Sequence, residues 1–387
     1  MRSCLMEVTM DNIGYVTYGR NDEAEARIKD RTVLFIDNDV AQQVLTMEDC
    51  IKVVEEAYRE FGLGRATASR SLHQVPQYGG HGWFNFAPMF SGIAQFGVLA
   101  IRMFTSISIP GEGRSSYSVT PGKYCEIILL YSTEDGALLS IMQGGHIQHM
   151  RVGATGGLSA KYMARSNASV LGIFGSAGMA STHAWAIAKV RPIKKIKVYS
   201  PNSEHRKSFA RQMSQDMGIE VVSVENPKEV MEGSDIVAGC TGSLVPVVRG
   251  EWLEPGMHVL AVTAGQLEDD VLRRSDQYVY SRPPYTDHQV ATPADQIPDS
   301  IPMKGYLSDQ WLERENRLVA GEKIKFLSDV VLGKTPGRAG EKEITCFASH
   351  GIPIQFAATA YRVHQLARER GLGQQLPLGC FLQDIRH

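Results

Sequence analysis

The sequence predicts an α/β protein of two domains, one a Rossmann domain with a parallel sheet and the other an α+β domain with an antiparallel sheet. A short apolar strand, residues 170–174, runs directly into a glycine turn and then into a helix over 182–190. Further apolar strands alternate with helical segments after it, which is the βαβ order of a parallel sheet. Between residues 69 and 131, apolar or alternating runs are separated by glycine and proline instead, the pattern of antiparallel strands.

The turn after the first parallel strand matches a dinucleotide-binding motif. Gly175 permits a tight turn, Ala180 is small enough for close packing of helix on strand, and the unpaired amides of the helix's first turn can hold a pyrophosphate. The usual second glycine is Ala177 here, and the adjacent Gly178 is the candidate to replace it. Taken alone, the motif also fits an ordinary strand–turn–helix corner. The predicted cofactor-binding residues of this turn are Gly175, Ser176, Ala177, Gly178, Met179 and Ala180.

Length and composition favour a cytoplasmic two-domain protein and exclude several other classes. The 387 residues suffice for two cores, and a net charge of −2 supplies no basic field for nucleic acid. No window approaches the roughly 20 apolar residues of a membrane span, and the N-terminus lacks the pattern of a signal peptide. The six cysteines contain no CxxC pair, which favours reduced thiols over disulfides or a zinc site.

The other elements follow from periodicity and capping. Residues 1–30 are polar and irregular, and we treat them as an extension of unknown use. Thr46 and Asp49 form a capping box for a helix whose apolar side chains recur at spacings of three and four until Gly62 ends it. Predicted strands span 32–36, 83–86, 97–104, 125–131, 196–199, 219–224, 235–240, 258–264 and 278–281, long helices span 143–164 and 353–370, and 106–123 is a loop.

The end of the second parallel strand indicates which nicotinamide cofactor is preferred. A carboxylate there would pair with the ribose hydroxyls of NAD and repel the additional phosphate of NADP. Ser200, Asn202 and Arg206 stand there instead, and their hydroxyl, amide and guanidinium groups favour NADP(H) over NAD(H). The alternative for Arg206 is a solvated helix residue. Thr241 and Thr263, which follow later strands, line the predicted cofactor path.

Three arginines in the first part of the chain are candidates to bind a substrate carboxylate. Arg70 follows a strand start, Arg102 lies within the apolar run 99–104, and Arg151 lies inside the long helix. A guanidinium in an apolar strand is costly unless it meets an anion, and its planar fork suits a carboxylate. A structural salt bridge is the alternative for each arginine, and Arg102 is the first choice among the three.

Four histidine and lysine side chains are considered as proton donors or metal ligands. His81 and Lys123 lie in glycine-rich loops and are candidate proton donors, with plain exposure to water as the alternative for each. His146 and His149 stand three residues apart on the long helix. No third ligand is spaced to help these two histidines, so no metal site is predicted.

Three separated segments resemble the ornithine cyclodeaminase/mu-crystallin family. They are LTMEDCIKVVEEAYREF, then GGHIQHMRVGATGGLSAKYMAR before the parallel sheet, and GKTPGRAGEKEITCFASHGIPIQFAATAYRVHQLARERGLGQ near the end. The similarity covers roughly residues 32–385. Because the segments occur in the right order, they are more specific together than the glycine motif.

The resemblance implies a homodimer that uses a nicotinamide cofactor and a small amino-acid or imino-acid substrate. It implies a substrate-binding and dimerisation domain from residues 31–150 and 330–387, with a Rossmann NAD(P)-binding domain over 151–329. It assigns Arg70, Arg102 and Arg151 to the substrate carboxylate, and Arg151 is also counted as catalytic. Arg102 stands where the family usually carries lysine, which keeps the charge.

One loop departs from the family and bears on the reaction. Cyclodeaminases carry an aspartate after the fifth Rossmann strand, where Gly265 stands here, and Glu268 and Asp269 are displaced by several residues. Cyclisation with loss of ammonia is therefore disfavoured, whereas hydride transfer needs a cofactor, a clamped substrate and a proton source. The predicted function is NAD(P)H-dependent reduction of a small imine bearing an α-carboxylate, or the reverse amino-acid oxidation. A cyclodeaminase with a relocated acid and a non-catalytic NADPH-dependent binding protein are the alternatives.

Overall fold

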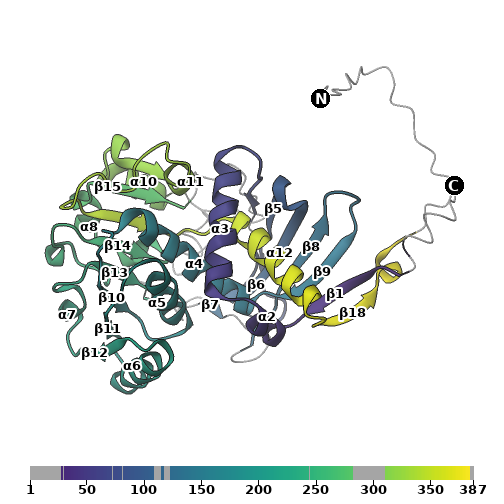
Figure 1. Cartoon of the computed structure of the whole chain (residues 1–387), viewed down its shortest axis with the longest axis horizontal. Coiled ribbons are helices and arrows are strands. Elements are labelled where there is room, and N and C mark those ends of the chain that lie inside the picture. Colours follow the sequence, from purple (N-terminus) through teal and green to yellow (C-terminus); the bar gives the residue numbers. More distant parts are fainter. Residues whose placement is uncertain are drawn as a thin grey trace, which may run out of the picture.

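A layer of helices lies between two β-sheets in the computed structural model of the chain (Figure 1). The structure describes residues 28, 30–71, 73–80, 82–108, 115–116, 123–243, 245–281 and 310–383. One sheet is parallel and the other is largely antiparallel, so the predicted fold class is confirmed. Among these described residues, no helix combines the length and apolar character needed to cross a bilayer.

The parallel sheet has the strand order of a doubly wound Rossmann fold. Its order is β12-β11-β10-β13-β14-β17-β15-β16. From β10 the chain adds β11 and β12 on one side, and it then crosses to the other side of β10 and adds β13 and β14. The crevice at the carboxyl ends of β10 and β13 is where such folds bind a dinucleotide. The strands are β10 (Val170–Phe174), β11 (Lys195–Tyr199), β12 (Glu220–Ser223), β13 (Ile236–Gly239), β14 (His258–Ala261), β15 (Gln277–Tyr280), β16 (Ile324–Phe326) and β17 (Thr345–Ala348).

One strand of this sheet comes from beyond the expected domain boundary. β17 pairs with β14 on one side and β15 on the other, although we expected the Rossmann domain to end at residue 329. All four of its residues are buried. A run of four residues does not reveal which sheet it joins, because that choice depends on contacts with strands far away in the sequence.

The second sheet presents one apolar face to the helices and another to the outside. Its order is β18-β1-β9-β8-β6-β4-β3, while β5 pairs with β6 and β2. Strand β6 runs on to Ser108 and pairs with β7, so the predicted loop 106–123 is partly strand. The strands are β1 (Thr32–Ile36), β2 (Ser69–Arg70), β3 (His73–Pro76), β4 (Trp83–Phe86), β5 (Met89–Ile93), β6 (Val98–Ser108), β7 (Ser115–Ser116), β8 (Glu126–Ser132), β9 (Leu138–Gln143) and β18 (Gln374–Pro377).

The long helices lie close to their predicted ranges. Helix α3 (Met47–Gly62) begins at the predicted cap, where the Thr46 side chain accepts a hydrogen bond from Asp49 N at 3.1 Å. Helix α12 (Pro353–Glu369) crosses β5 and β6, and α4 (Gly145–Met163) packs along α5 (Gly178–Val190). The other helices are α2 (Asn38–Val44), α6 (Ser203–Met217), α7 (Pro227–Met231), α8 (Asp269–Arg274), α10 (Gln310–Leu318) and α11 (Leu327–Val331).

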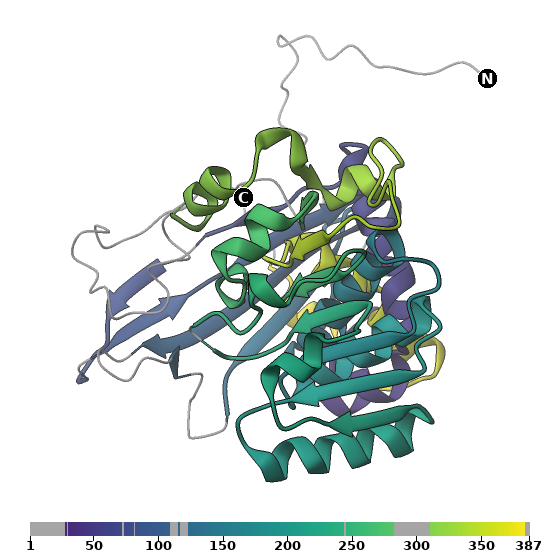
Figure 2. The ribbon, with the colours of Figure 1, turned by 90° about the vertical axis from the view of Figure 1, so that its left-hand side faces the viewer.

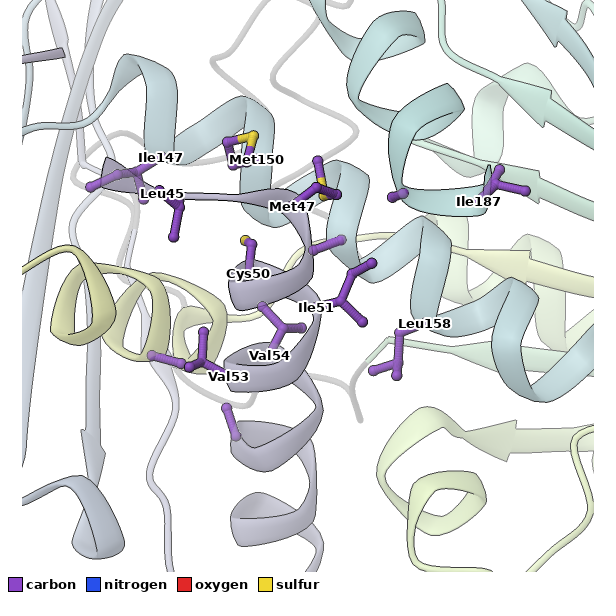
Figure 3. Close-up of a cluster of buried hydrophobic side chains, with 14 of the residues drawn as sticks. Leu45, Met47, Cys50, Ile51, Val53, Val54, Ile147, Met150, Leu158 and Ile187 are labelled. Carbon is purple, nitrogen blue, oxygen red and sulfur yellow. The ribbon is translucent and has the colours of Figure 1, made fainter. Parts of the chain in front are cut away.

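A continuous apolar core joins the two sheets through these helices. Figure 3 shows Val53 of α3 on the side that faces α12 and Ile51 on the side of Leu158 of α4. Figure 2 shows the parallel strands side by side above α6, and the antiparallel strands extend to the left of the view. The shared core holds the crevice of the parallel sheet in a defined position against the inner face of the antiparallel sheet.

Gly175 is the turn residue that tolerates no side chain. Its φ of +117° is strained for other residues, and a Cβ there would lie 2.4 Å from the carbonyl oxygen of Cys240. We expect Gly175→Ala to lower the free energy of unfolding by about 1–3 kcal/mol, measured by urea denaturation. Gly321→Ala is the control, because nothing lies within 4 Å of its added Cβ. Equal effects of the two substitutions would contradict the close approach.

Candidate active site

The amino end of α5 is open to an anion. Gly175 N donates to Tyr199 O at 2.8 Å, which holds the turn after β10 against the end of β11. The N-cap residue Ala177 offers no side-chain hydrogen bond, and no acidic residue stands in the first helical turn. The first amides of α5 are therefore uncapped and positively polarised, which fits the pyrophosphate of a dinucleotide.

Gly178 differs from the second glycine that we expected it to replace. Its backbone is not left-handed, and the ring of His149 on α4 fills the space beside it instead. A Cβ on Gly178 would lie 3.2 Å from both Cε1 and Nε2 of that ring. Burial lowers the pKa of His149, partly opposed by Glu126, so a neutral imidazole lies beside the start of α5.

Hydroxyl and amide groups, and no carboxylate, stand at the end of β11. The side-chain oxygens of Ser176 and Ser200 lie 2.8 Å apart and join the ends of the first two parallel strands. Asn202 caps α6, since its side-chain oxygen accepts a hydrogen bond from His205 N at 2.9 Å.

Arg206 is neither the solvated residue nor the open cation that the sequence suggested. It is 4% exposed, and its Cζ lies 5.6 Å from the ring centroid of Tyr199. Nη1 donates to Ser200 O at 3.1 Å, and Nη2 donates to the carboxylate of Glu225. The Arg206 guanidinium therefore lies at the end of β11, where Ser200 O and the Glu225 carboxylate already bind it.

Gln266 links the two loops that carry Thr241 and Thr263. Its side-chain nitrogen donates to Thr241 O at 2.9 Å and to Thr263 Oγ1 at 3.3 Å, and the residue is 1% exposed. The loops after β13 and β14 are therefore held together at the carboxyl edge of the sheet. Our sequence reasoning missed Gln266, because a glutamine within a loop has no distinguishing pattern.

The three candidate arginines come together on the inner side of the antiparallel sheet. Arg70 is paired with Met89, and Met89 with Arg102, so these residues of β2, β5 and β6 share a row and a face. Phe356 of α12 lies over that face, with the Cζ atoms of Arg102 and Arg151 at 4.5 and 4.3 Å from its ring centroid. The charge of Arg70 also contributes to the lowered pKa of Arg151.

Arg102 forms the salt bridge that we considered as its alternative role. Nε and Nη2 donate to the two carboxylate oxygens of Glu126 at 2.9 and 2.6 Å. Both side chains are buried, and Nη1 lies 3.6 Å from the sulfur of Met89. The bidentate edge of Arg102 is thus used within the protein, which removes it as the first choice for a substrate carboxylate.

Arg151 is a buried guanidinium whose described hydrogen-bond partners are neutral side-chain amides. Nε and Nη2 donate to Gln148 Oε1 at 3.2 and 2.6 Å, and Nη1 donates to Gln355 Oε1 at 2.6 Å. Within the described ranges no carboxylate pairs with it. Burial lowers the pKa of Arg151 to about 9, and the neighbouring charge of Arg102 adds to the effect. The side chain still carries its charge at neutral pH.

Lys123, Glu268 and Asp269 are the proposed proton donor and relocated acids that the structure describes. Lys123 is exposed, and His81 lies outside the described residues. Nothing lies within 4 Å of a Cβ added at Gly265, so its surroundings are open. Glu268 accepts from Gly250 N at 2.8 Å, and Asp269 accepts from Arg314 at 2.6 and 2.8 Å. Neither carboxylate is available as a relocated acid.

Some residues of the pocket could have been found from their spacing. Gln148 stands three residues before Arg151 on one helix, a spacing that places the two side chains together. Glu126 begins an apolar strand, and a buried carboxylate is the same kind of signal that singled out Arg102. Gln355 and Phe356 belong to α12 and are distant from Arg151 in the sequence. Gln355 stands 204 residues beyond Arg151, and no local pattern indicates that they are in contact.

The Arg102–Glu126 pair generates a stability prediction. Glu126→Gln leaves a buried guanidinium without its counter-charge, so we expect the free energy of unfolding to fall by about 3 kcal/mol in urea denaturation. Arg31→Gln breaks an ion pair with Asp135 whose side chains are 39% and 40% exposed, and it should cost less than about 1 kcal/mol. A Glu126→Gln protein as stable as the parent would show that the pair is not held in the folded chain.

Comparisons with known proteins agree with this geometry. Alanine dehydrogenase of Archaeoglobus fulgidus is 26% identical over 360 residues, which cover 89% of this chain and 98% of that protein. Δ1-pyrroline-2-carboxylate reductase of Bacillus cereus is 27% identical over 256 residues, covering 65% of this chain and 73% of its own. The structure of Thermococcus litoralis Δ1-pyrroline-2-carboxylate reductase in complex with NADH and L-proline is 28% identical, has a TM-score of 0.72 and covers 89% of this chain and 100% of that one.

The family model extends over nearly the whole of the described chain. The sequence model of the ornithine cyclodeaminase/mu-crystallin family matches residues 31–371, which include the parallel sheet, the antiparallel sheet apart from β18, the α5 turn and all three arginines. The chain therefore belongs to the ornithine cyclodeaminase/mu-crystallin family, as its three motif segments predicted.

Proposed function

We propose that the protein is an NAD(P)H-dependent oxidoreductase that reduces a small imine bearing an α-carboxylate, or oxidises the corresponding amino acid. The observation that carries this proposal is Arg151, which is 5% exposed and hydrogen-bonded to amide oxygens. A buried cation without a counter-charge is costly, so the pocket favours an anionic ligand. An α-carboxylate supplies that charge in the planar form that a guanidinium binds best.

The cofactor side of the proposal rests on the open end of α5. Residues 175–180 hold the pyrophosphate, and Thr241 and Thr263 line the path beyond it. A bound reduced nicotinamide supplies the hydride that the imine carbon accepts. The relative from Thermococcus litoralis was solved with NADH and L-proline, which supports a reduced nicotinamide and a small cyclic imino acid as the reacting pair.

The residues of the chain orient the substrate and keep water away. Arg151 anchors the carboxylate and Arg70 contributes from the neighbouring strand row, while Arg102, whose charge Glu126 neutralises, supports the inner face of the sheet beside them. Phe356 forms an apolar wall beside both buried guanidinium groups, and low polarity strengthens their attraction for an anion. Arg70 and Arg151, which we call the carboxylate clamp, fix the imine carbon in one orientation, and this lowers the entropic part of the barrier. His81 and Lys123 remain the candidate proton donors of the loops.

Two alternatives differ from this proposal in testable ways. A cyclodeaminase would need an acid near Gly265, and the contacts of Glu268 and Asp269 give it no support. A binding protein without turnover would share the cofactor site and the clamp, so only an assay of turnover separates it from an enzyme.

We further propose a homodimer located in the cytoplasm. The outer face of the antiparallel sheet carries large apolar side chains, with Val75, Phe84, Phe90 and Leu99 exposed by 36% to 45%. Such a face is suited to an identical copy of itself. The five cysteines within the described residues are free, in keeping with a reducing compartment. The segments around the clamp would then form the substrate and dimerisation domain.

The function is tested by cofactor consumption with a panel of cyclic imines and of 2-oxo acids mixed with amines. We expect turnover with a carboxylated imine and no ammonia release from ornithine or lysine. Arg151→Met should raise the imine KM roughly 10–100-fold, because a charge-assisted bond contributes about 1.5–3 kcal/mol, while NADPH affinity is retained. Arg368→Met, an exposed change on α12, is the control. Tight NADPH binding without any turnover would instead support the binding protein.

The preference for NADP(H) over NAD(H) is a separate proposal. It is supported by Ser200 at the end of β11, where a carboxylate would repel a 2′-phosphate, and by the pairing of the nearby Glu225 carboxylate with Arg206. Ser200→Asp should weaken NADPH binding at least tenfold and affect NADH little, measured by fluorescence titration, since about 1.4 kcal/mol of repulsion corresponds to that factor. Because Glu225 and Ser200 already bind the Arg206 guanidinium, Arg206→Met tests whether that cation takes part. Tighter binding of NADH than NADPH by the parent protein would reverse the preference.

A further inference from the structure

Four titratable side chains that the proposed mechanism does not use form a cluster at one end of the parallel sheet. Glu315 comes from α10, Tyr278 and Tyr280 from β15, and His350 follows β17. Tyr278 Oη donates to Glu315 Oε1 at 2.7 Å, and His350 Nε2 lies 3.7 Å from the same oxygen. The ring centroid of Tyr280 lies 5.0 Å from that of Tyr278 and 6.0 Å from that of His350.

The charges of this cluster point to the histidine as its cation. The Glu315 side chain is 0% exposed, and in the described part of the chain no lysine or arginine pairs with it. Burial raises the pKa of Tyr278 and of Tyr280, and Glu315 adds to both shifts, so the phenols stay neutral and bring no positive charge to the carboxylate. A buried carboxylate also needs a positive charge, and His350 is the member of the cluster that can supply one.

His350 lies just beyond the carboxyl end of β17, near the nicotinamide half of the crevice, and the next residue, Gly351, borders Arg151. In a doubly wound sheet the two halves of a dinucleotide lie on opposite sides of the switch point, so β13, β14 and β17 face the nicotinamide half. Ser349 N donates to Ala261 O at 3.0 Å, which sets His350 just beyond the end of β14. Gly351 follows with a φ of +68°, and a Cβ there would lie 3.0 Å from Arg151 Nη1. His350 is thus one residue from a direct neighbour of the clamp.

We propose that His350 is the general acid that protonates the substrate nitrogen, and that Glu315 is the positioning residue that holds its imidazolium. The inference rests on the proposed reduction of a carboxylated imine. When the imine carbon gains a hydride, the electron pair of the C=N double bond moves to nitrogen. That nitrogen takes one proton from the imidazolium, which becomes neutral imidazole. In the reverse direction neutral His350 accepts the proton from the amine.

The titratable and charged groups around His350 come from several elements. Glu315 of α10 and Tyr280 of β15 lie against its ring, Tyr278 is hydrogen-bonded to Glu315, and Arg151 of α4 borders the next residue, Gly351. Cys346 of β17 also interacts electrostatically with Glu315 and both tyrosines. Glu315 is therefore the carboxylate that positions the imidazole ring.

The first test removes the acid itself. His350→Gln should lower kcat for imine reduction about 100-fold or more, the usual contribution of a general acid, with NADPH affinity retained in fluorescence titration. His350→Ala should recover part of the lost kcat when imidazole is added, which a structural role would not produce. His364→Gln is the control, because it removes another buried histidine. His364 lies on α12 and is hydrogen-bonded to Ser140 of β9. A His350→Gln enzyme with the parent kcat overturns the inference.

The second test keeps the histidine and removes its partner. Glu315→Gln preserves size but removes the carboxylate that positions the imidazole, so kcat should fall while the imine KM changes little. An unchanged kcat overturns the role of Glu315, and this test applies even if a His350 variant does not fold. The parent enzyme separates the two proposals, because a parent without imine turnover contradicts the proposed function, whereas an active parent with insensitive variants contradicts only the assignment of His350.

Discussion

The structure depends on the burial of two guanidinium groups against one aromatic ring. Arg102 and Arg151 both lie over Phe356 and repel each other in surroundings that exclude water. The first is neutralised by the carboxylate of Glu126, and the second is hydrogen-bonded to amides alone among its described partners. This inequality leaves one buried positive charge whose described hydrogen-bond partners are neutral, and a bound anion would balance it.

Helix α4 joins this charge to the cofactor crevice. Arg151 projects from one side of the helix toward α12, while His149 and Gly153 lie on the side packed against α5. At Gly153 a Cβ would come within 2.6 Å of Thr182, so the two helices are in close contact. Because a helix is stiff over a few turns, the distance between the clamp and the start of α5 varies little. One helix thus connects the buried charge of Arg151 to the uncapped amino end of α5.

The chemistry at the pocket depends on which acids are free to act. Glu268 and Asp269 cap and pair with neighbouring elements, and Gly265 supplies no side chain, so this loop offers no acid for cyclisation. At the far side of the same crevice, a buried carboxylate lies beside His350.

Local sequence determined much of the fold by itself. The strand before Gly175, the cap at Thr46 and the alternation of strands with helices depend on steric preference and periodicity over a few residues, and all of them are present in the structure. Tertiary structure alone decided that β17 lies between β14 and β15 in the parallel sheet, that Glu126 binds the guanidinium of Arg102, and that Arg206 is buried against β11. These outcomes join residues that are distant in the chain or depend on burial, and no local pattern specifies which partners compete for the same charged group.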